Sequence, residues 1–448
     1  MSERPVERSA TGRALAVPSG RLTRLARLGS VASGAMGRAA VGAARDLTRG
    51  TAPDFRKLLV TPRNLGSLAE ELARMRGAAM KLGQLLSMDA GEVLPPELAE
   101  ILARLRDDAH FMPPAQLKKV LAANWPADWL GRFERFDTRP IAAASIGQVH
   151  RARLKDGRLM AIKVQYPGVA RSIDSDVANV GALAKASGLL PKGFDLAPYM
   201  EAARAQLREE TDYLREGRRL AAFGARLEGS ERFRAPVWHE DWSTTEILAM
   251  SFEEGRAIET AAELGPEGSS AVAVDLIDLF LRELFDWGEM QSDPNFANYM
   301  FDRENERIVL LDFGAAREID RGLAERYRDL IAAGLAGDAT ALEQAAEAIG
   351  FLSAGVAPHH RKRIVSMIGM VFEALTAAPL YDFTDERLSR RIQAEGEALA
   401  ADGFVPPPVP IDALYLQRKI GGLFLLARRL GAKAPAAEML ERWVARAA

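Results

Sequence analysis

The feature that most constrains this chain is the stretch over residues 290–317. It reads Met-Gln-Ser-Asp-Pro-Asn-Phe-Ala-Asn-Tyr-Met-Phe, then a polar turn over 302–307, then Ile-Val-Leu-Leu-Asp-Phe-Gly. This pattern predicts a loop that offers Asp293 and Asn298, followed by a hairpin whose apolar second strand delivers Asp312 to a turn that glycine permits. We therefore expect two carboxylates and one amide oxygen to converge.

These side chains suit Mg-nucleotide chemistry. Mg2+ takes hard oxygen ligands in small number and leaves the other positions to water and phosphates. In protein kinases a catalytic-loop Asp accepts the substrate proton, while an Asn and the Asp of Asp-Phe-Gly hold the metal. On this basis Asp293 is the candidate catalytic residue, and Asn298 and Asp312 are the candidate Mg2+ ligands. A strand end with a solvated turn does not explain why three such oxygens cluster.

Composition excludes several other chemistries. With 448 residues, 48% of them apolar, the chain is long enough for two or three cores. A net charge of -2 provides no global field for binding nucleic acid. Cysteine is absent, and the five histidines show no paired metal-binding spacing, so we expect neither a thiolate site nor a zinc site. No apolar run is long enough to predict a transmembrane helix.

The N-terminal part divides into a basic leader and a helical extension. Residues 1–52 are rich in arginine and poor in acids, which is typical of a membrane-surface segment, an organelle-targeting leader or a flexible basic tail. Over 53–132, apolar spacing predicts helices at 65–87 and 96–109. The first contains the Lys-Leu-Gly-Gln run at 81–84, where a mid-helix glycine indicates a packing or close-approach requirement.

Between residues 133 and 252 the periodicity becomes that of strands. A small-residue loop at 142–149 leads through a strand to an Asp-Gly hairpin turn and then to Ala-Ile-Lys, which presents Lys163 as kinases present their phosphate-binding lysine. Alanines stand in the loop where kinases have glycines, so we expect a stiffer loop that binds nucleotide differently. A helix predicted over 199–227 is where we expect the glutamate partner of Lys163.

Two further strands are predicted, over 233–238 and 244–252. The second ends in a polar, glycine-ended link that suits a hinge whose backbone binds an adenine ring. Residues 253–448 are expected to be helical after the central stretch, with a linker at 406–408 and a packed or membrane-contacting helix over 414–430. The residues expected to bind ATP or ADP are Ala142, Ala143, Ala144, Ser145, Gly147, Gln148, Val149, Lys163, Met250, Phe252 and Glu253.

Together these motifs resemble the UbiB family of atypical kinases, also called the ADCK or aarF-domain kinases. The run at 81–84 looks like the family's K-x-G-Q motif, 142–150 like its alanine-rich loop, and 210–212 like its E-x-D motif. Residues 291–298 are similar to the catalytic loop of the branch tied to ubiquinone biosynthesis. Other branches more often read His-Pro-Gly-Asn there.

The resemblance implies an α+β, bilobal protein-kinase-like fold with a small β-rich N-lobe at 133–252, a helical insert in it, and a helical C-lobe at 253–448. It also implies that the K-x-G-Q extension lies over the active site and keeps protein substrates out, with Lys81 and Gln84 reaching towards the E-x-D region. The implied regulatory residues are Lys81, Gly83, Gln84, Glu210 and Asp212.

The implied activity is a Mg-ATP-dependent, lipid-responsive ATPase or an unusual phosphotransferase that supports ubiquinone biosynthesis. Its implied partners are an anionic membrane surface, quinone precursors and quinone-biosynthesis proteins, with a homodimer as one arrangement. Such a protein would lie in the cytoplasm, peripheral to the inner membrane of a bacterium, or on the matrix side in a mitochondrion.

Two other functions stay open. One is a nucleotide-gated scaffold or lipid-binding pseudokinase, because the alanine loop and the overlying extension depart from an ordinary kinase. The other is a small-molecule phosphotransferase of the aminoglycoside-kinase sort, which shares the Asp and Asp-Phe-Gly residues but does not account for the extension around Lys81.

Overall fold

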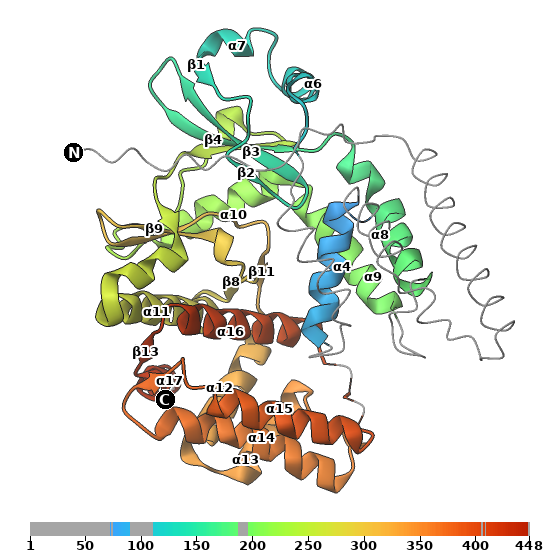
Figure 1. The fold of residues 1–448 in the computed structure, drawn as a ribbon, viewed down its shortest axis with the longest axis vertical. Coiled ribbons are helices and arrows are strands. Elements are labelled where there is room, and N and C mark those ends of the chain that lie inside the picture. The colour runs from blue at the N-terminus through green and yellow to red at the C-terminus, as the bar shows by residue number, and fades with distance from the viewer. Residues whose placement is uncertain are drawn as a thin grey trace, which may run out of the picture. The chain divides into compact units, whose positions relative to one another are not determined.

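The computed structural model describes residues 72, 75–89, 111–186, 196–404, 406–407 and 409–446 (Figure 1). The chain forms two compact units. The N-unit comprises Met1–Phe223 with Pro236–Glu253, and the C-unit comprises Gly224–Ala235 with Glu254–Ala448. The basic leader expected over 1–52 and the helix expected over 96–109 lie outside the described residues.

The N-unit is built on a five-stranded antiparallel sheet in the order β1-β3-β4-β6, with β2 paired to β3. The strands are β1 (Phe133–Phe136), β2 (Ala142–Ala143), β3 (Gly147–Leu154), β4 (Leu159–Gln165) and β6 (Ile247–Ser251). The Asp-Gly turn joins β3 to β4 as expected, and Gly157 adopts a φ of +95°, a conformation that side chains disfavour. Lys163 pairs with Val149 on one side and Leu248 on the other, so it lies on an inner strand.

An aromatic core covers one face of this sheet beneath α6 (Pro114–Asn124), α7 (Trp129–Arg132) and the short η1 (Glu240–Trp242). The Trp125 indole packs edge-on against Trp242 with ring centroids 5.1 Å apart, and its Nε1 donates to the Trp242 carbonyl. His150 is fully buried nearby, with Nδ1 2.7 Å from the Asp137 carbonyl. Burial lowers the pKa of His150 to about 4, so this imidazole stays neutral at physiological pH.

Among the described residues, the N-unit also contains α4 (Arg76–Asp89), α8 (Val169–Ala186), α9 (Ala197–Glu210) and α10 (Tyr213–Arg226), the last of which leaves the unit after Phe223. Helix α4 packs against α8 and α9 (Figure 1). The prediction of a single helix over 199–227 was wrong, because the helix is interrupted at Thr211-Asp212. There the Asp212 carboxylate accepts from the Arg215 N–H at 3.0 Å and begins a new helix.

The C-unit contains a four-stranded sheet in the order β5-β10-β9-β7, and a separate pair of β8 with β11. The strands are β5 (Phe233–Arg234), β7 (Arg256–Ala257), β8 (Glu289–Gln291), β9 (Tyr299–Asp302), β10 (Arg307–Leu310) and β11 (Ala316–Glu318). Antiparallel pairing of β9 with β10 confirms the expected hairpin. The strand expected over 233–238 is shorter, since only β5 forms, and it runs parallel to β10 in this sheet.

The rest of the C-unit is mostly helical. Its helices are η2 (Ile258–Leu264), α11 (Gly265–Arg282), η3 (Glu283–Trp287), η4 (Phe296–Asn298), α12 (Arg321–Ala336), α13 (Ala339–Ile349), α14 (Pro358–Thr376), α15 (Arg387–Ala401), α16 (Ile411–Arg429) and α17 (Ala436–Ala445). The tail is not wholly helical as expected, because β12 (Tyr381–Asp382) pairs with β13 (Lys433–Ala434). Helix α16 packs against α11 and buries Tyr415, Leu416 and Leu423. Within the described part of the chain, no helix is long and apolar enough to cross a membrane.

Candidate functional site

A buried ion pair orients the strand lysine of the N-unit. The Lys163 Nζ on β4 lies 2.7 and 3.0 Å from the two carboxylate oxygens of Glu216 on α10, and both side chains are buried. The Tyr213 ring lies 5.1 Å from the same ammonium. A charge-assisted pair held from a strand and a helix fixes the direction of the lysine head group. This is the Lys–Glu arrangement that kinases use to hold nucleotide phosphates.

The glutamate partner is Glu216 on α10, which lies within the 199–227 segment where sequence reasoning looked without naming a particular glutamate. Glu216 lies on one face of α10, and the residues on this face recur at helical spacing and are all buried. These are Tyr213, Glu216, Gly217, Leu220 and Phe223. The signal that identifies Glu216 as the partner is a glutamate on the buried face of the helix that begins after Asp212.

The alanine-rich loop is a tight turn held against its own sheet. The Ala144 N–H donates to the Gly147 carbonyl at 2.8 Å. A Cβ on Gly147 would lie 2.5 Å from the Val164 carbonyl oxygen, so only glycine fits there. The Gln148 side chain is fully buried, with its amide bonded to the Met112 N–H and to His150. Of the residues expected to bind nucleotide, Gln148 thus directs its side chain into the interior.

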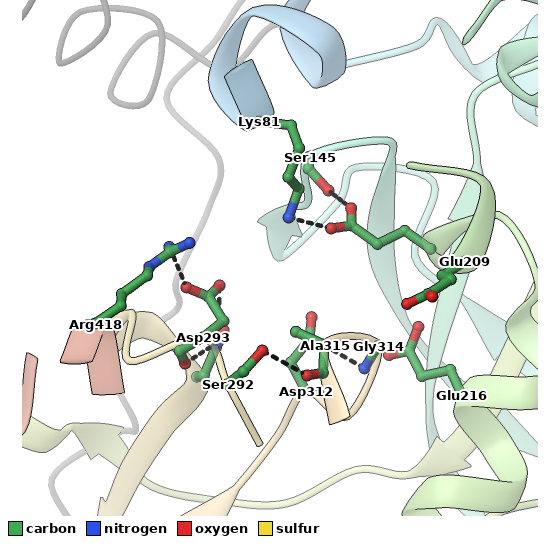
Figure 2. Close-up of polar contacts among 12 residues, drawn as sticks. Lys81, Ser145, Glu209, Glu216, Ser292, Asp293, Asp312, Gly314, Ala315 and Arg418 are labelled. Atoms are coloured by element: carbon green, nitrogen blue, oxygen red, sulfur yellow. Dashed lines mark hydrogen bonds and ion pairs between the residues drawn. The ribbon is translucent and has the colours of Figure 1, made fainter. Parts of the chain in front are cut away.

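Glu210 connects the K-x-G-Q helix to the alanine-rich loop, and Figure 2 shows Lys81 and Ser145 directed at one carboxylate group. At the end of α9 its carboxylate forms an ion pair with Lys81 of α4 and accepts a hydrogen bond from Ser145 Oγ at 2.9 Å. Lys81 is itself buried. Helix α4 also approaches the loop at Gly77, where a Cβ would lie 3.0 Å from Ile146 and 3.3 Å from the Ser145 carbonyl oxygen.

The other residues assigned to regulation have different surroundings. Gly83 is buried on α4, and Gln84 lies on the same helix, but the Gln84 side chain lies outside what the structure describes. Asp212 does not reach Lys81 in any described contact. Its carboxylate starts α10 and lies 3.8 Å from Arg218.

The hinge segment ends the last strand of the N-unit sheet. Met250 is buried and pairs with Ala161. The Phe252 N–H already donates to the Leu159 carbonyl at 2.9 Å, so the sheet occupies this donor. The Glu253 carboxylate accepts from Ser251 Oγ at 2.5 Å. A base at this edge would therefore need backbone groups other than the Phe252 N–H.

The candidate catalytic loop of the C-unit places Asp293 between two partners (Figure 2). Asn298 Nδ2 donates to the Asp293 carbonyl at 3.2 Å and to its carboxylate at 3.3 Å. From α16, Arg418 Nη2 contacts the other carboxylate oxygen at 2.8 Å. The helix lies directly on the loop, because a Cβ on Gly422 would meet Pro294 at 2.2 Å. Sequence reasoning did not find Arg418, which lies far along the chain.

Asp312 follows β10 next to this loop. The Leu311 N–H donates to the Asn298 carbonyl at 2.9 Å, which brings the two candidate metal ligands into neighbouring positions. Asp312 Oδ1 accepts from the Gly314 N–H at 2.9 Å, and Phe313 is buried. The donor set of carboxylate and amide oxygens is the hard-oxygen type that Mg2+ prefers, so these residues fit that ion.

A buried polar network contacts the residues on either side of this loop. Lys419 Nζ lies 2.9 Å from the Tyr299 hydroxyl and 3.3 Å from Gln291 Oε1, and these two residues flank the loop. Glu283 Oε2 is 3.7 Å away. Burial raises the pKa of the Glu283 carboxyl to about 7. Burial also acts to lower the pKa of Lys419, but the Glu283 carboxylate and Tyr299 together outweigh it and raise that pKa. Sequence reasoning treated Lys419 only as part of an amphipathic helix.

Two features define this chain as a kinase-like protein. One unit contains a sheet whose strand Lys pairs with a helical Glu. The other unit is mainly helical and contains Asp293, Asn298 and Asp312. The ABC1 atypical kinase-like domain matches residues 104–346. The chain therefore belongs to this family of atypical kinases, the ABC1 or UbiB family, as the motifs indicated.

Relatives that match most of this chain are also named atypical kinases. The mitochondrial atypical kinase COQ8 of Saccharomyces cerevisiae is 34% identical over 437 residues, which cover 97% of this chain and 87% of the relative. The mitochondrial atypical kinase COQ8B of Rattus norvegicus is 34% identical, covering 93% and 79%. A solved structure of Rv3197 from Mycobacterium tuberculosis with erythromycin shares the fold, with a TM-score of 0.60 and 23% identity over 83% of this chain and 93% of that one.

Proposed function

We propose that this protein is a Mg-ATP-dependent atypical kinase or ATPase of the UbiB type that supports ubiquinone (coenzyme Q) biosynthesis. The observation that carries the proposal is the catalytic loop and hairpin. The Leu311 to Asn298 hydrogen bond brings Asn298 beside Asp312, and Asn298 in turn contacts Asp293. Three oxygen-bearing side chains in this arrangement suit phosphoryl transfer.

Each residue has a defined task in this reaction. Lys163, held by Glu216, would bind the nucleotide phosphates, and Asn298 and Asp312 would hold Mg2+. The ion, when bound, supplies charge neutralisation at the transferring phosphoryl group. Asp293 would position or deprotonate the acceptor, which is water or a hydroxyl group. Arg418 and Asn298 orient Asp293, so catalysis comes mainly from positioning and electrostatics.

The quinone part of the proposal comes from the relatives and the catalytic-loop sequence, and the membrane part comes from the resemblance to the UbiB family. The COQ8 relatives are named as mitochondrial proteins. We propose peripheral contact with an anionic membrane, on the matrix side of a mitochondrion or the cytoplasmic side of a bacterial inner membrane. Quinone precursors and quinone-biosynthesis proteins are the partners that this location would offer.

ATP hydrolysis by the purified chain tests the proposal. Turnover is measured with Mg2+ or with excess EDTA, each with anionic liposomes, neutral liposomes or none. We expect hydrolysis that requires Mg2+ and rises with anionic liposomes. Tight nucleotide binding without hydrolysis under any of these conditions would contradict the proposal and favour the scaffold. Fast phosphorylation of soluble alcohols would favour the small-molecule phosphotransferase.

The contacts of Glu210 favour a second role for the K-x-G-Q helix, that of restraining the alanine-rich loop. Lys81→Ala removes the ion pair between α4 and Glu210, and Glu210→Gln weakens it from the other side and also alters the Ser145 contact. We expect both variants to phosphorylate themselves or to change the ratio of ATP to ADP affinity by about tenfold, a difference of about 1.4 kcal/mol.

Incorporation of labelled phosphate and calorimetric titration of each nucleotide measure these two effects. Arg204→Ala is a matched control, because Arg204 lies on α9 and pairs only with exposed Glu201 among its described contacts. If Lys81→Ala and Glu210→Gln behave as this control does, the Lys81 contact has no regulatory role.

A further inference from the structure

Two histidines and an aspartate converge where α14 begins and α15 ends. His359 and His360 occupy the first turn of α14, and Asp402 directly follows α15. The His359 Nε2 lies 3.1 Å from Asp402 Oδ2, and the His360 Nε2 lies 3.0 Å from the same oxygen. The two rings are 4.0 Å apart between centroids. Helices α14 and α15 pack side by side in the C-unit (Figure 1).

This arrangement places three metal-ligand atoms together. A carboxylate oxygen only accepts hydrogen bonds, so without a metal both imidazoles must direct an N–H at one oxygen. A divalent ion replaces these protons and uses the nitrogen lone pairs instead. Tetrahedral Zn2+ with bonds of about 2.0–2.1 Å separates neighbouring ligand atoms by about 3.3 Å. The two histidine nitrogens lie 3.1 and 3.0 Å from Asp402 Oδ2, and all three ligand atoms lie within 4.8 Å of one another.

The surroundings leave these three residues available to an ion. The His360 side chain is 11% exposed and packs against the Phe404 ring, which fixes one ligand. His359 and Asp402 are 63% and 50% exposed, so an ion and its water can enter. The nearby Arg361 is paired with Glu343 and Glu347, and Arg363 with Glu395, so these guanidinium groups are engaged by other carboxylates.

The geometry points to a binding site for a divalent transition-metal ion, Zn2+ above all, formed by His359, His360 and Asp402. Imidazole ligands favour Zn2+ over Mg2+ and Ca2+, which prefer oxygen, so the site differs in kind from Asn298 and Asp312. The ion would tie the start of α14 to the end of α15. The sequence had indicated no zinc site, because adjacent histidines have no familiar spacing and Asp402 lies 42 residues beyond His360.

Isothermal titration calorimetry with zinc chloride tests this site on the full chain, free of any affinity tag and stripped with EDTA. We expect one Zn2+ bound per chain with a dissociation constant in the micromolar range or tighter, and no comparable binding of Mg2+ or Ca2+. His359→Ala and Asp402→Asn, both at exposed positions, should each weaken Zn2+ binding at least about tenfold, as loss of one of three ligands requires.

Two control variants locate the ion. His239→Ala removes a histidine of the N-unit and should leave Zn2+ binding unchanged, and so should Asp312→Asn. Absence of Zn2+ binding by the wild-type chain would overturn the inference. So would undiminished binding by both His359→Ala and Asp402→Asn, or loss of binding in either control. Zn2+ binding is measured without ATP turnover, so the result tests this site independently of the proposed function.

Discussion

Replacing Asp312 with Asn is expected to lower ATP hydrolysis at least about 100-fold, which corresponds to about 2.7 kcal/mol of transition-state stabilisation. The change removes a negative charge from the candidate Mg2+ ligand but keeps an oxygen that accepts from the Gly314 N–H. The turn should therefore survive, while the metal that neutralises the phosphates is held weakly. Steady-state hydrolysis at saturating Mg-ATP measures the loss, and circular dichroism shows whether the fold is retained.

Asp302→Asn provides the matched control for this variant. Asp302 lies at the end of β9 on the same hairpin, where its partly exposed carboxylate accepts from the Glu304 and Asn305 N–H groups. The same chemical change there should leave turnover within about twofold of the wild type, since exposed substitutions away from the site have small effects. Full activity in Asp312→Asn would remove Asp312 from the metal site.

The part of the site that sequence could predict is local. The β9–β10 hairpin follows from alternating apolar residues around a polar turn, and it places Asp312 five residues after the turn ends at Arg307. The Ala-Ile-Lys strand follows from the Asp-Gly turn in the same way. In both cases hydrogen bonding between neighbouring segments decides the geometry. The period of the apolar residues and the residue types in the turn are therefore sufficient to predict it.

The part that sequence could not predict depends on contacts between distant segments. The partner of Lys163 was expected within 199–227, and the resemblance implied that Lys81 reaches the Glu210 region, but which glutamate faces which lysine depends on the break at Asp212. Glu210 faces Lys81 and Glu216 faces Lys163. Nothing in the local pattern pairs Arg418 with Asp293, which is 125 residues away. Such pairs arise when helices pack, so they follow from the tertiary fold and not from the period of either helix.

Lys419→Met is expected to destabilise the C-unit by about 3–5 kcal/mol at pH 8, because it leaves the Glu283 carboxylate buried without a cation. Glu283 is 1% exposed, and its described polar contacts are the Lys419 ammonium at 3.7 Å and the Gln291 N–H at 3.4 Å. Methionine fills a similar volume, so the loss measures charge and not a cavity. Urea denaturation measures it, with exposed Lys433→Met as a control that should change stability by less than about 1 kcal/mol.

The pH dependence separates this mechanism from general damage to α16. Burial raises the folded pKa of Glu283 from its usual 4.5 to about 7, so its contribution to stability is present in full below about pH 4.5 and is lost as pH rises through 7. In Lys419→Met the pKa rises further, because the attractive ammonium is gone. The destabilisation should therefore be clearly smaller at pH 5.5 than at pH 8.

Adding Glu283→Gln to Lys419→Met should recover most of the stability lost at pH 8 and remove this pH dependence. Equal losses at both pH values, or a double variant no more stable than Lys419→Met alone, would show that Lys419 supports the catalytic loop through Tyr299 and Gln291 rather than by compensating Glu283.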